Sequence, residues 1–277
     1  MATTDQGNRY QLFTGDRTGE VVQNGEYVYF HASMRTEQDS VMFSTREAGG
    51  ETPVVQVKAS VPGAPEISPV EDVVRFMAVG DSAVIRVSMD DFPSKPPGME
   101  EDSVLLYDIV VTEIVDEEAF MGRLPIAEKE AIAASKITKE LEPVRLAFAA
   151  QTVVAYNAGE LDGDIKTTAT GLKYIIHEEG TGKQAEAGQG VKVQYIGSTT
   201  SDGNVFDQSF GRGQALPFVL GTGRVIPGWD QGIALLKQGA KATFFIPAEL
   251  GYGAQGSGPN IPPGAELAFY VELEEVQ

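Results

Sequence analysis

The chain has 277 residues, 42% of them hydrophobic, which is enough for two folded domains that each bury a core. The absence of cysteine excludes disulfides and thiol chemistry, and two histidines are too few for a histidine-based metal site. The net charge of −19 argues against binding to nucleic acid or to anionic membrane surfaces, both of which attract basic residues, and leaves solubility or basic clients as reasons for the acidity.

Residues 1–115 form the first predicted domain, made of strands, turns and one helix. Most of the charge lies in this part, because residues 1–124 hold 22 acidic and 9 basic residues. The strand-forming runs are rich in β-branched and aromatic residues and read GEYVYFHAS, VMFS, SAVIRVSM and SVLLYDIVVTEI. The helix is expected in the segment ISPVEDVVRF, between the second and third of these runs.

Residues 116–166 are predicted to be a helical connector followed by a loop. The apolar residues recur at helical spacings and are Ile126, Ile132, Ile137, Leu141, Val144 and Phe148. Pro125 lies near the expected start of the helix and Gly159 beyond its end. Because Pro143 has no amide hydrogen, we expect the helix to kink or break near Glu142. The following ELDGDIKTTATG has turn residues and no apolar period, which predicts the loop.

Residues 167–277 are predicted to form an antiparallel α+β domain. Its strand-forming runs are LKYIIHEE, VKVQYIG, LPFVL, KATFFIP and AELAFYVELEEV, separated by glycine-rich turns. One helix, expected from about Gly228 to Lys237, interrupts them. A sheet with one helix on its face is the simplest arrangement of these elements.

The order of elements in the first domain repeats in the last, which predicts a duplicated fold. We align GEYVYFHAS with GVKVQYIGS, VMFS with NVFDQ and SVLLYDIVVTEI with AELAFYVELEEV. We also align ISPVEDVVRFMAVGDSAVIRVSM with VIPGWDQGIALLKQGAKATFFIPA. We assign Gly80 to Gly239, Val70 to Trp229, Tyr107 to Phe269 and His31 to Tyr195. The first copy has FPSKPPGMEEDS in place of the glycine-rich loop of the last domain.

Six aromatic residues from separate elements of the last domain are candidates for one cluster. They are Tyr195, Phe206, Phe218, Trp229, Tyr252 and Phe269. They can be the core of a small domain, or they can line a pocket. Tyr252 in a GYG turn and Asp207 directly after Phe206 are unusual for a core and favour the pocket.

Other catalytic signatures are absent or weak. GTGKQA at 180–185 fits a dinucleotide-binding pattern, but no apolar helix follows it. The sequence has no GxxxxGK[ST], HExxH or GxSxG. His177 has no nearby nucleophile and is expected to be an exposed strand residue.

Residues 168–277 closely resemble the FKBP-type peptidyl-prolyl isomerases. The resemblance lies in GVKVQYIG, DGNVFDQS, LPFVLGTGRVIPGWDQGIALLKQGAKATFFIPAELGYG and NIPPGAELAFYVELEEV, in this order. It implies two FKBP-like domains of α+β fold, each a curved antiparallel sheet around a short helix. Residues 167–277 would be the isomerase, and residues 1–115 a divergent copy without activity. No metal or organic cofactor is implied.

The resemblance also implies a site, with Trp229 as the floor of an apolar pocket. The implied catalytic residues are Tyr195, Phe206, Asp207, Trp229, Tyr252 and Phe269, and the implied substrate-binding residues are Leu216, Val225, Ile226 and Ile261. We expect Asp207→Ala and Trp229→Ala to lower catalysis without unfolding the domain.

The partners implied are proline-containing peptides, unfolded or nascent proteins and macrolides of the type the family binds. A homodimer through the N-terminal part is also considered. Two functions compete with catalysis: a pocket that binds proline segments without turnover, and a chaperone that acts through the non-catalytic part.

The sequence contains no run of about 18 apolar residues that would predict a membrane span, and MATTDQGNRY does not resemble a signal peptide. A removed leader would fit the bacterial periplasm or cell envelope, which we favour over the cytoplasm.

Overall fold

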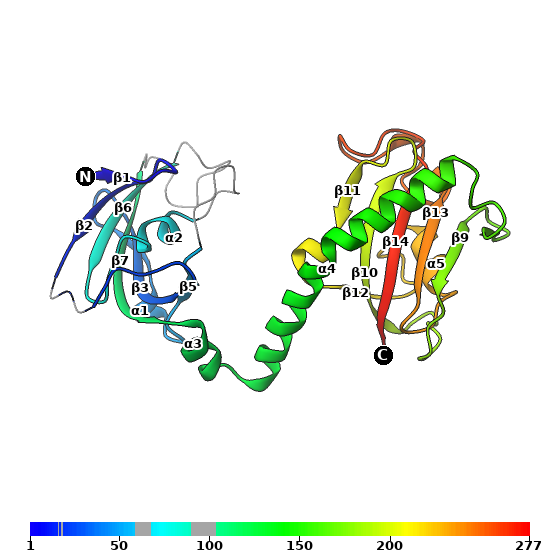
Figure 1. Cartoon of the computed structure of the whole chain (residues 1–277). Coiled ribbons are helices and arrows are strands. Elements are labelled where there is room, and N and C mark those ends of the chain that lie inside the picture. The colour runs from blue at the N-terminus through cyan, green and yellow to red at the C-terminus, as the bar shows by residue number, and fades with distance from the viewer. Residues whose placement is uncertain (16, 18, 59–67, 90–103) are drawn as a thin grey trace. The chain divides into compact units, whose positions relative to one another are not determined.

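A computed structural model describes residues 1–277 except 16, 18, 59–67 and 90–103. The chain divides into two compact units, residues 1–125 and 126–277. Each unit has one seven-stranded antiparallel sheet with a short helix (Figure 1). The predicted α+β class is therefore correct for both. The loop FPSKPPGMEEDS of the first unit lies outside the described residues.

The elements of the first unit follow the expected order. They are β1 (Ala2–Thr3), β2 (Arg9–Phe13), β3 (Tyr27–Thr36), β4 (Val41–Ser44), α1 (Thr45–Ala48), β5 (Val54–Gln56), α2 (Pro69–Val74), β6 (Ser82–Ser88), β7 (Val104–Val115) and α3 (Glu117–Arg123). Helix α2 begins with a complete capping box, in which Ser68 and Glu71 bond each other's backbone amides. This fixes the start of a helix that is only six residues long.

The second unit begins with a long helix and continues with the other sheet. Its elements are α4 (Ile126–Asn157), β8 (Lys166–Thr167), β9 (Lys173–Glu178), β10 (Gly190–Thr199), β11 (Val205–Gln208), η2 (Phe210–Arg212), β12 (Leu216–Val219), α5 (Pro227–Ile233), β13 (Lys241–Ile246), η3 (Ala248–Leu250), η4 (Gly253–Gln255) and β14 (Leu267–Val276). Helix α5 is shorter than expected, because Leu235 and Leu236 bond to carbonyls three residues back and so tighten its end.

The two sheets have the same topology. The first runs β1-β2-β6-β7-β3-β4 with β5 beside β3, and the second runs β8-β9-β13-β14-β10-β11 with β12 beside β10. Gly80 and Gly239 precede equivalent strands, and both have φ of +89°. The register places Ile85 opposite Tyr107 in one sheet and Phe244 opposite Phe269 in the other. The predicted duplication is therefore visible strand by strand.

One predicted correspondence is wrong by register. Gly25 donates its amide to Val57, and Gly188 donates to Leu220 at the equivalent turn, with φ of +94° and +89°. Counting from these glycines, the equivalent of Tyr195 is Ala32, not His31. The pairing agrees, because Ala32 lies opposite Ile109 and Tyr195 opposite Val271.

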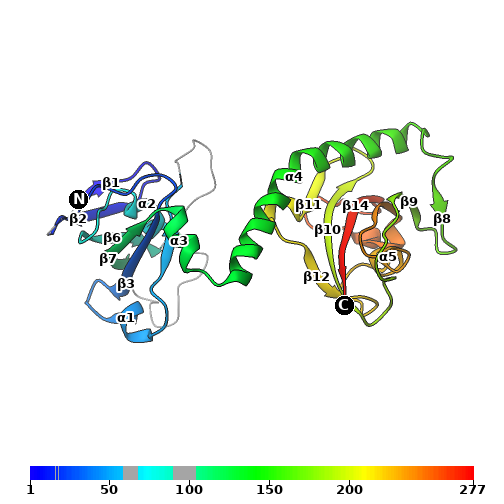
Figure 2. The same ribbon diagram turned by 60° about the horizontal axis from the view of Figure 1, so that its bottom comes forward.

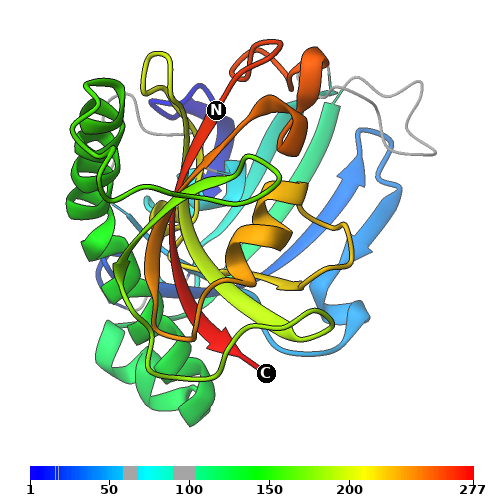
Figure 3. The ribbon, with the colours of Figure 1, turned by 90° about the vertical axis from the view of Figure 1, so that its right-hand side faces the viewer.

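Of the kink or break predicted near Glu142, the break does not occur, because helix α4 is continuous through Pro143. The helix does change direction partway along its length (Figure 2). Of the apolar residues that predicted this helix, Ile126, Ile132, Ile137, Val144 and Phe148 are exposed. Figure 3 shows the helix beside the outer face of the second sheet. Side chains between Leu141 and Tyr156 pack on that face in two clusters. Their buried members are Ala149, Ile196, Phe210 and Tyr270 in one, and Val153, Ile175, Phe245 and Ala268 in the other. This packing holds the helix together across the proline.

The other face of the second sheet curves around α5 and encloses the main core. Trp229, with 3% of its surface exposed, Ile233, Phe244 and Phe269 belong to this core. The indole is therefore a core residue as well as a candidate pocket residue. The expectation that Trp229→Ala leaves the domain intact is weakened by this burial, since removing a buried tryptophan costs about 3–5 kcal/mol.

Candidate active site

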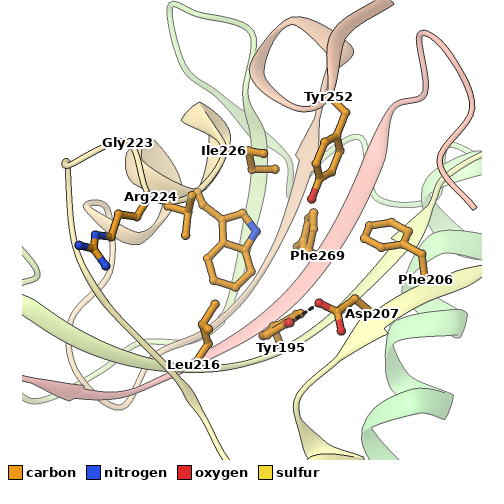
Figure 4. Close-up of a pocket in the computed structure, with 11 residues that line it drawn as sticks. Tyr195, Phe206, Asp207, Leu216, Gly223, Arg224, Ile226, Tyr252 and Phe269 are labelled. Carbon is orange, nitrogen blue, oxygen red and sulfur yellow. Dashed lines mark hydrogen bonds between the residues drawn. The ribbon is translucent and has the colours of Figure 1, made fainter. Parts of the chain in front are cut away.

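A cavity of about 370 Å³ opens on the concave face of the second sheet, over α5 (Figure 4). It is lined by Tyr195, Phe206, Asp207, Leu216, Gly223, Arg224, Val225, Ile226, Trp229, Tyr252 and Phe269. All six predicted catalytic residues are among them, with three of the four predicted substrate-binding residues. Residues from strands, a helix and two loops thus meet at one place.

The fourth, Ile261, does not line this cavity. Its side chain is 6% exposed and belongs to the core cluster, while its carbonyl accepts a bond from the Ser257 amide at 2.9 Å. Its implied contact with a ligand is therefore not supported by its position.

The indole of Trp229 is placed by the start of α5. Ile226 is the N-cap residue with extended backbone angles, and Pro227 occupies the first helical position, where its missing amide costs nothing. A side chain on Gly228 would lie 2.5 Å from Ile246, and one on Gly232 would lie 2.7 Å from Phe244. The two glycines let the helix approach β13 closely, and this leaves Trp229 between the core and the cavity.

The aromatic rings around Trp229 meet it mostly edge to face. The ring of Tyr195 lies 5.1 Å from the indole at 83°, and that of Phe269 lies 5.3 Å away at 90°. Phe206 meets Phe269 at 5.6 Å and 78°. Such pairs contribute about 0.5–1.5 kcal/mol each beyond burial. The cavity wall is therefore a connected set of rings with fixed orientations.

A polar group of three side chains closes one edge of the cavity. The Tyr195 hydroxyl donates to Asp207 (dashed in Figure 4). Arg212 donates to Asp207 Oδ1 at 2.7 Å and to Tyr195 Oη at 2.8 Å. Burial alone would raise the pKa of Asp207, but the bonds from Tyr195 and Arg212 outweigh it and lower that pKa. Burial, followed by the bond to Asp207, raises the pKa of Tyr195 to about 12. Asp207 is thus an anion and Tyr195 a neutral phenol at neutral pH.

Two further donors face the cavity. Figure 4 shows the Tyr252 hydroxyl pointing into it, and this side chain is 39% exposed. Burial, with the nearby Asp207 charge, raises the pKa of Tyr252, so its hydroxyl keeps its proton. The backbone amide of Ile226 donates no hydrogen bond to any described residue. Both groups are free to donate to a ligand carbonyl.

The sequence analysis missed Arg212 and gave no role to Gly223 and Arg224. Arg212 follows β11 by four residues, and only the short helix η2 brings its guanidinium back to Asp207. No spacing rule predicts this return. Arg224 directly precedes Val225 in the lining loop, and its exposed side chain points away from the aromatic rings (Figure 4).

The first unit lacks these groups at the equivalent positions. By strand pairing, Ala32 stands for Tyr195, and Met42 and Phe43 stand for Phe206 and Asp207. Val70 stands for Trp229 when the helices are aligned at their ends, where Met77 bonds Val74 as Leu236 bonds Ile233. Gly197 is replaced by Met34, which packs with Tyr107 against Met89 and Leu105. A long side chain therefore occupies the position where the second unit has none.

The described residues contain no group of three or more His, Cys, Asp or Glu side chains that could hold a metal ion. In the same part of the chain, no helix is both long enough and apolar enough to cross a membrane.

His177 is exposed on β9, where its ring meets Phe148 edge to face at 4.9 Å and Nε2 lies 2.8 Å from Thr243 Oγ1. It lies on the sheet face that α4 covers, and so belongs to the packing of α4.

Residues 181–274 match the family model for FKBP-type peptidyl-prolyl cis-trans isomerase. The Arabidopsis thaliana peptidyl-prolyl cis-trans isomerase FKBP15-1 is 45% identical over 125 residues, covering 45% of this chain and 80% of the relative. FK506-binding protein 2 of Yarrowia lipolytica is 51% identical, covering 38% of this chain and 72% of the relative. The probable isomerase FkpA of Neisseria meningitidis serogroup B is 46% identical, covering 40% of both.

The identities are high over most of the length of two of these relatives. The matched family model also spans every residue that lines the cavity, from Tyr195 to Phe269. The chain therefore belongs to the FKBP-type peptidyl-prolyl cis-trans isomerase family.

Proposed function

We propose that the cavity over Trp229 is where this isomerase catalyses cis–trans exchange of X-Pro bonds, without covalent chemistry. The observation that carries this assignment is the combination of an aromatic floor and walls with one ionised carboxylate at the edge. A proline ring is apolar and fits such a floor, while the adjoining peptide needs polar partners. The cavity supplies both within one opening.

The catalytic effect follows from the electronic structure of the amide. Rotation breaks amide resonance, at a barrier of ~18–20 kcal/mol. The twisted amide has a less charged oxygen and a more pyramidal nitrogen than the planar one. An apolar cavity therefore favours the twisted form, and each ~1.4 kcal/mol of this preference gives a tenfold rate increase.

The polar groups orient the substrate. The Asp207 carboxylate interacts with the polarised carbonyl carbon of the twisting bond or holds the bound backbone. Tyr252 donates to a carbonyl beside the proline, and the Ile226 amide donates to a second one. The bonds from Tyr195 and Arg212 support these roles, because they keep Asp207 charged and in place.

The substrates proposed are proline-containing segments of unfolded or nascent proteins, and macrolides of the FKBP type are proposed ligands of the same cavity. Export to the bacterial periplasm or envelope is our proposal for localisation; its support is the likeness to a bacterial relative. Fractionation of cells that express the full gene tests it. Dimerisation through the N-terminal part also stays a proposal, which sedimentation of the full chain tests.

A chaperone role for the first unit is the second candidate. Its edge strand β4 exposes three consecutive apolar side chains, with Val41 57%, Met42 41% and Phe43 45% exposed. An apolar edge strand can pair with an extended segment of another chain. Phe43→Ser should then weaken protection of an unfolded protein against aggregation, while exchange of a short X-Pro peptide stays unchanged. Phe13→Ser, equally exposed on β2, is the matched control and should change neither.

The test of catalysis is protease-free exchange spectroscopy on a short X-Pro peptide. We expect the full chain to accelerate exchange and Asp207→Ala to reduce this acceleration with the fold retained. Binding of the peptide without any acceleration would instead favour the non-catalytic binding module. Full activity in a folded Asp207→Ala variant would show that the polar edge is not part of the site.

A further inference from the structure

Helix α4 contacts the loop that places the polar edge of the cavity. This loop, residues 208–213, begins at Gln208, the last residue of β11, and ends before β12. A side chain on Gly213 would lie 2.2 Å from Ser135 Oγ, and one on Gly211 would lie 2.9 Å from Glu142 Oε1. Gly213 also has φ of +71°, which favours glycine. The loop and the helix are therefore in close contact, with no room for a side chain at either glycine unless a neighbour moves.

One hydrogen-bonded chain connects α4 to the carboxylate of Asp207. Glu142 Oε1 accepts a bond from Gln208 Nε2 at 2.6 Å. The side-chain oxygen of Gln208 in turn accepts a bond from the Gly211 backbone amide at 2.8 Å. The backbone amide of Gln208 donates to Asp207 Oδ1 at 2.9 Å. Glu142 and Gln208 are both half-buried, so water screens this contact less than it would on the open surface.

The same loop carries the arginine that holds Asp207. Arg212 comes directly after Gly211 and bonds both Asp207 and Tyr195. Gln208 therefore bonds both ends of the loop: Asp207, which directly precedes it, and Gly211, which directly precedes Arg212. In Figure 4 the pale green helix, α4, passes on the side of Asp207 away from the indole. The helix thus supports the polar edge from outside the cavity.

We propose that Glu142 is a positioning residue for catalysis: through Gln208 it fixes the Asp207–Arg212 pair, so that α4 is part of the working site. The inference rests on the role proposed for Asp207. It predicts that the acceptor oxygen at position 142 matters rather than the charge, because the partner is a neutral amide. Glu142→Gln keeps this oxygen and Glu142→Ala removes it.

The experiment measures kcat and KM for exchange of an X-Pro peptide by the full chain. We expect Glu142→Ala to lower kcat/KM by about tenfold, less than the ~100-fold that an ångström of misplacement can cost. Glu142→Gln should stay within about twofold of the parent, since its amide oxygen can accept the same bond. Glu130→Ala, an exposed glutamate on the same helix, is the matched control and should equal the parent.

A double-variant cycle separates positioning from general loosening of the fold. If Glu142 acts through Asp207, Glu142→Ala adds little to the loss already caused by Asp207→Ala. Additive losses, equal losses in Glu142→Ala and Glu142→Gln, or parent activity in Glu142→Ala would each overturn the proposal. If Asp207→Ala itself has parent activity, the assignment of the site fails instead. Thermal unfolding of each variant identifies any that is not folded.

Discussion

Gly197→Ala is the change that most directly tests the shape of the cavity. Gly197 lies on β10 opposite Phe269 on one side and Asp207 on the other. A Cβ there would lie 2.6 Å from Phe269 Cε1 and 2.8 Å from Phe206 Cε2. Its backbone has no positive φ, so alanine introduces no backbone strain. The only effect expected is that one methyl group displaces two rings of the wall.

The size of the effect follows from these distances. Carbon atoms pack best at ~3.5–4.0 Å, so the rings must move by about 1 Å. A displacement of about 1 Å at a reacting site can cost ~100-fold in rate, and we expect a loss of this order in kcat/KM. Overpacking costs about 1–3 kcal/mol and removing a glycine regains about 0.4–1 kcal/mol. The unfolding temperature should therefore fall by only a few degrees, at roughly 2–4 °C per kcal/mol.

The assay is protease-free exchange of an X-Pro peptide, with thermal unfolding of the same samples. Gly163→Ala is the control, because a Cβ at that position meets nothing within 4 Å and its φ is not positive. It should match the parent in rate. Parent activity together with parent stability in Gly197→Ala would refute the argument, since the rings would then have room that the structure does not give them.

Three further predictions use the same measurements. Trp229→Ala should lose about 3–5 kcal/mol of stability along with activity, whereas Trp229→Phe should keep more of both; equal unfolding temperatures for the parent and Trp229→Ala would contradict the burial of the indole. Activity should be independent of pH between about 5 and 10 and fall only below about pH 4, because the pKa of Asp207 is lowered and that of Tyr195 is raised to about 12; a midpoint near neutral pH in the rate profile would exclude this pair as the relevant groups. The Asp207 contribution to stability is likewise present above its unfolded-state pKa and is lost as pH falls through the lower folded value. Gly213→Ala should destabilise the second unit by about 1–3 kcal/mol, because its Cβ collides with Ser135 in α4 at a residue of positive φ; an unchanged melting curve would show that α4 is not seated on the loop.

The aromatic cluster and Asp207 could be picked out from the residue pattern, whereas their catalytic roles were implied by the family resemblance. Trp229 follows a proline at a helix start, Tyr252 lies in a glycine turn, and Phe206 and Asp207 lie on a short strand. Arg212 carried no such signal, since its guanidinium reaches Asp207 only after η2 turns the chain back. The resemblance supplied the four substrate-binding residues, of which Leu216, Val225 and Ile226 line the cavity, while Ile261 lies in the core.

The register error in the first copy has a physical origin in two nearby glycines. Gly188 has a positive φ, which favours glycine, whereas Gly190 does not. Gly25 also has a positive φ and is therefore the equivalent of Gly188. The sequence does not show φ, so GEY was aligned with GVK, and His31 instead of Ala32 was assigned to Tyr195. Hydrogen bonding at the turn distinguishes them.

Because α4 packs on the second sheet, a truncated fragment of this protein should keep that helix. A fragment that starts at residue 167, after the whole helix, would leave Ile196, Tyr270, Phe245 and Ala268 uncovered on the outer side of its sheet. Such an exposed apolar surface favours self-association. If a truncated fragment self-associates, that result would therefore say nothing about the first unit. A fragment that starts at Ile126 carries its own cover.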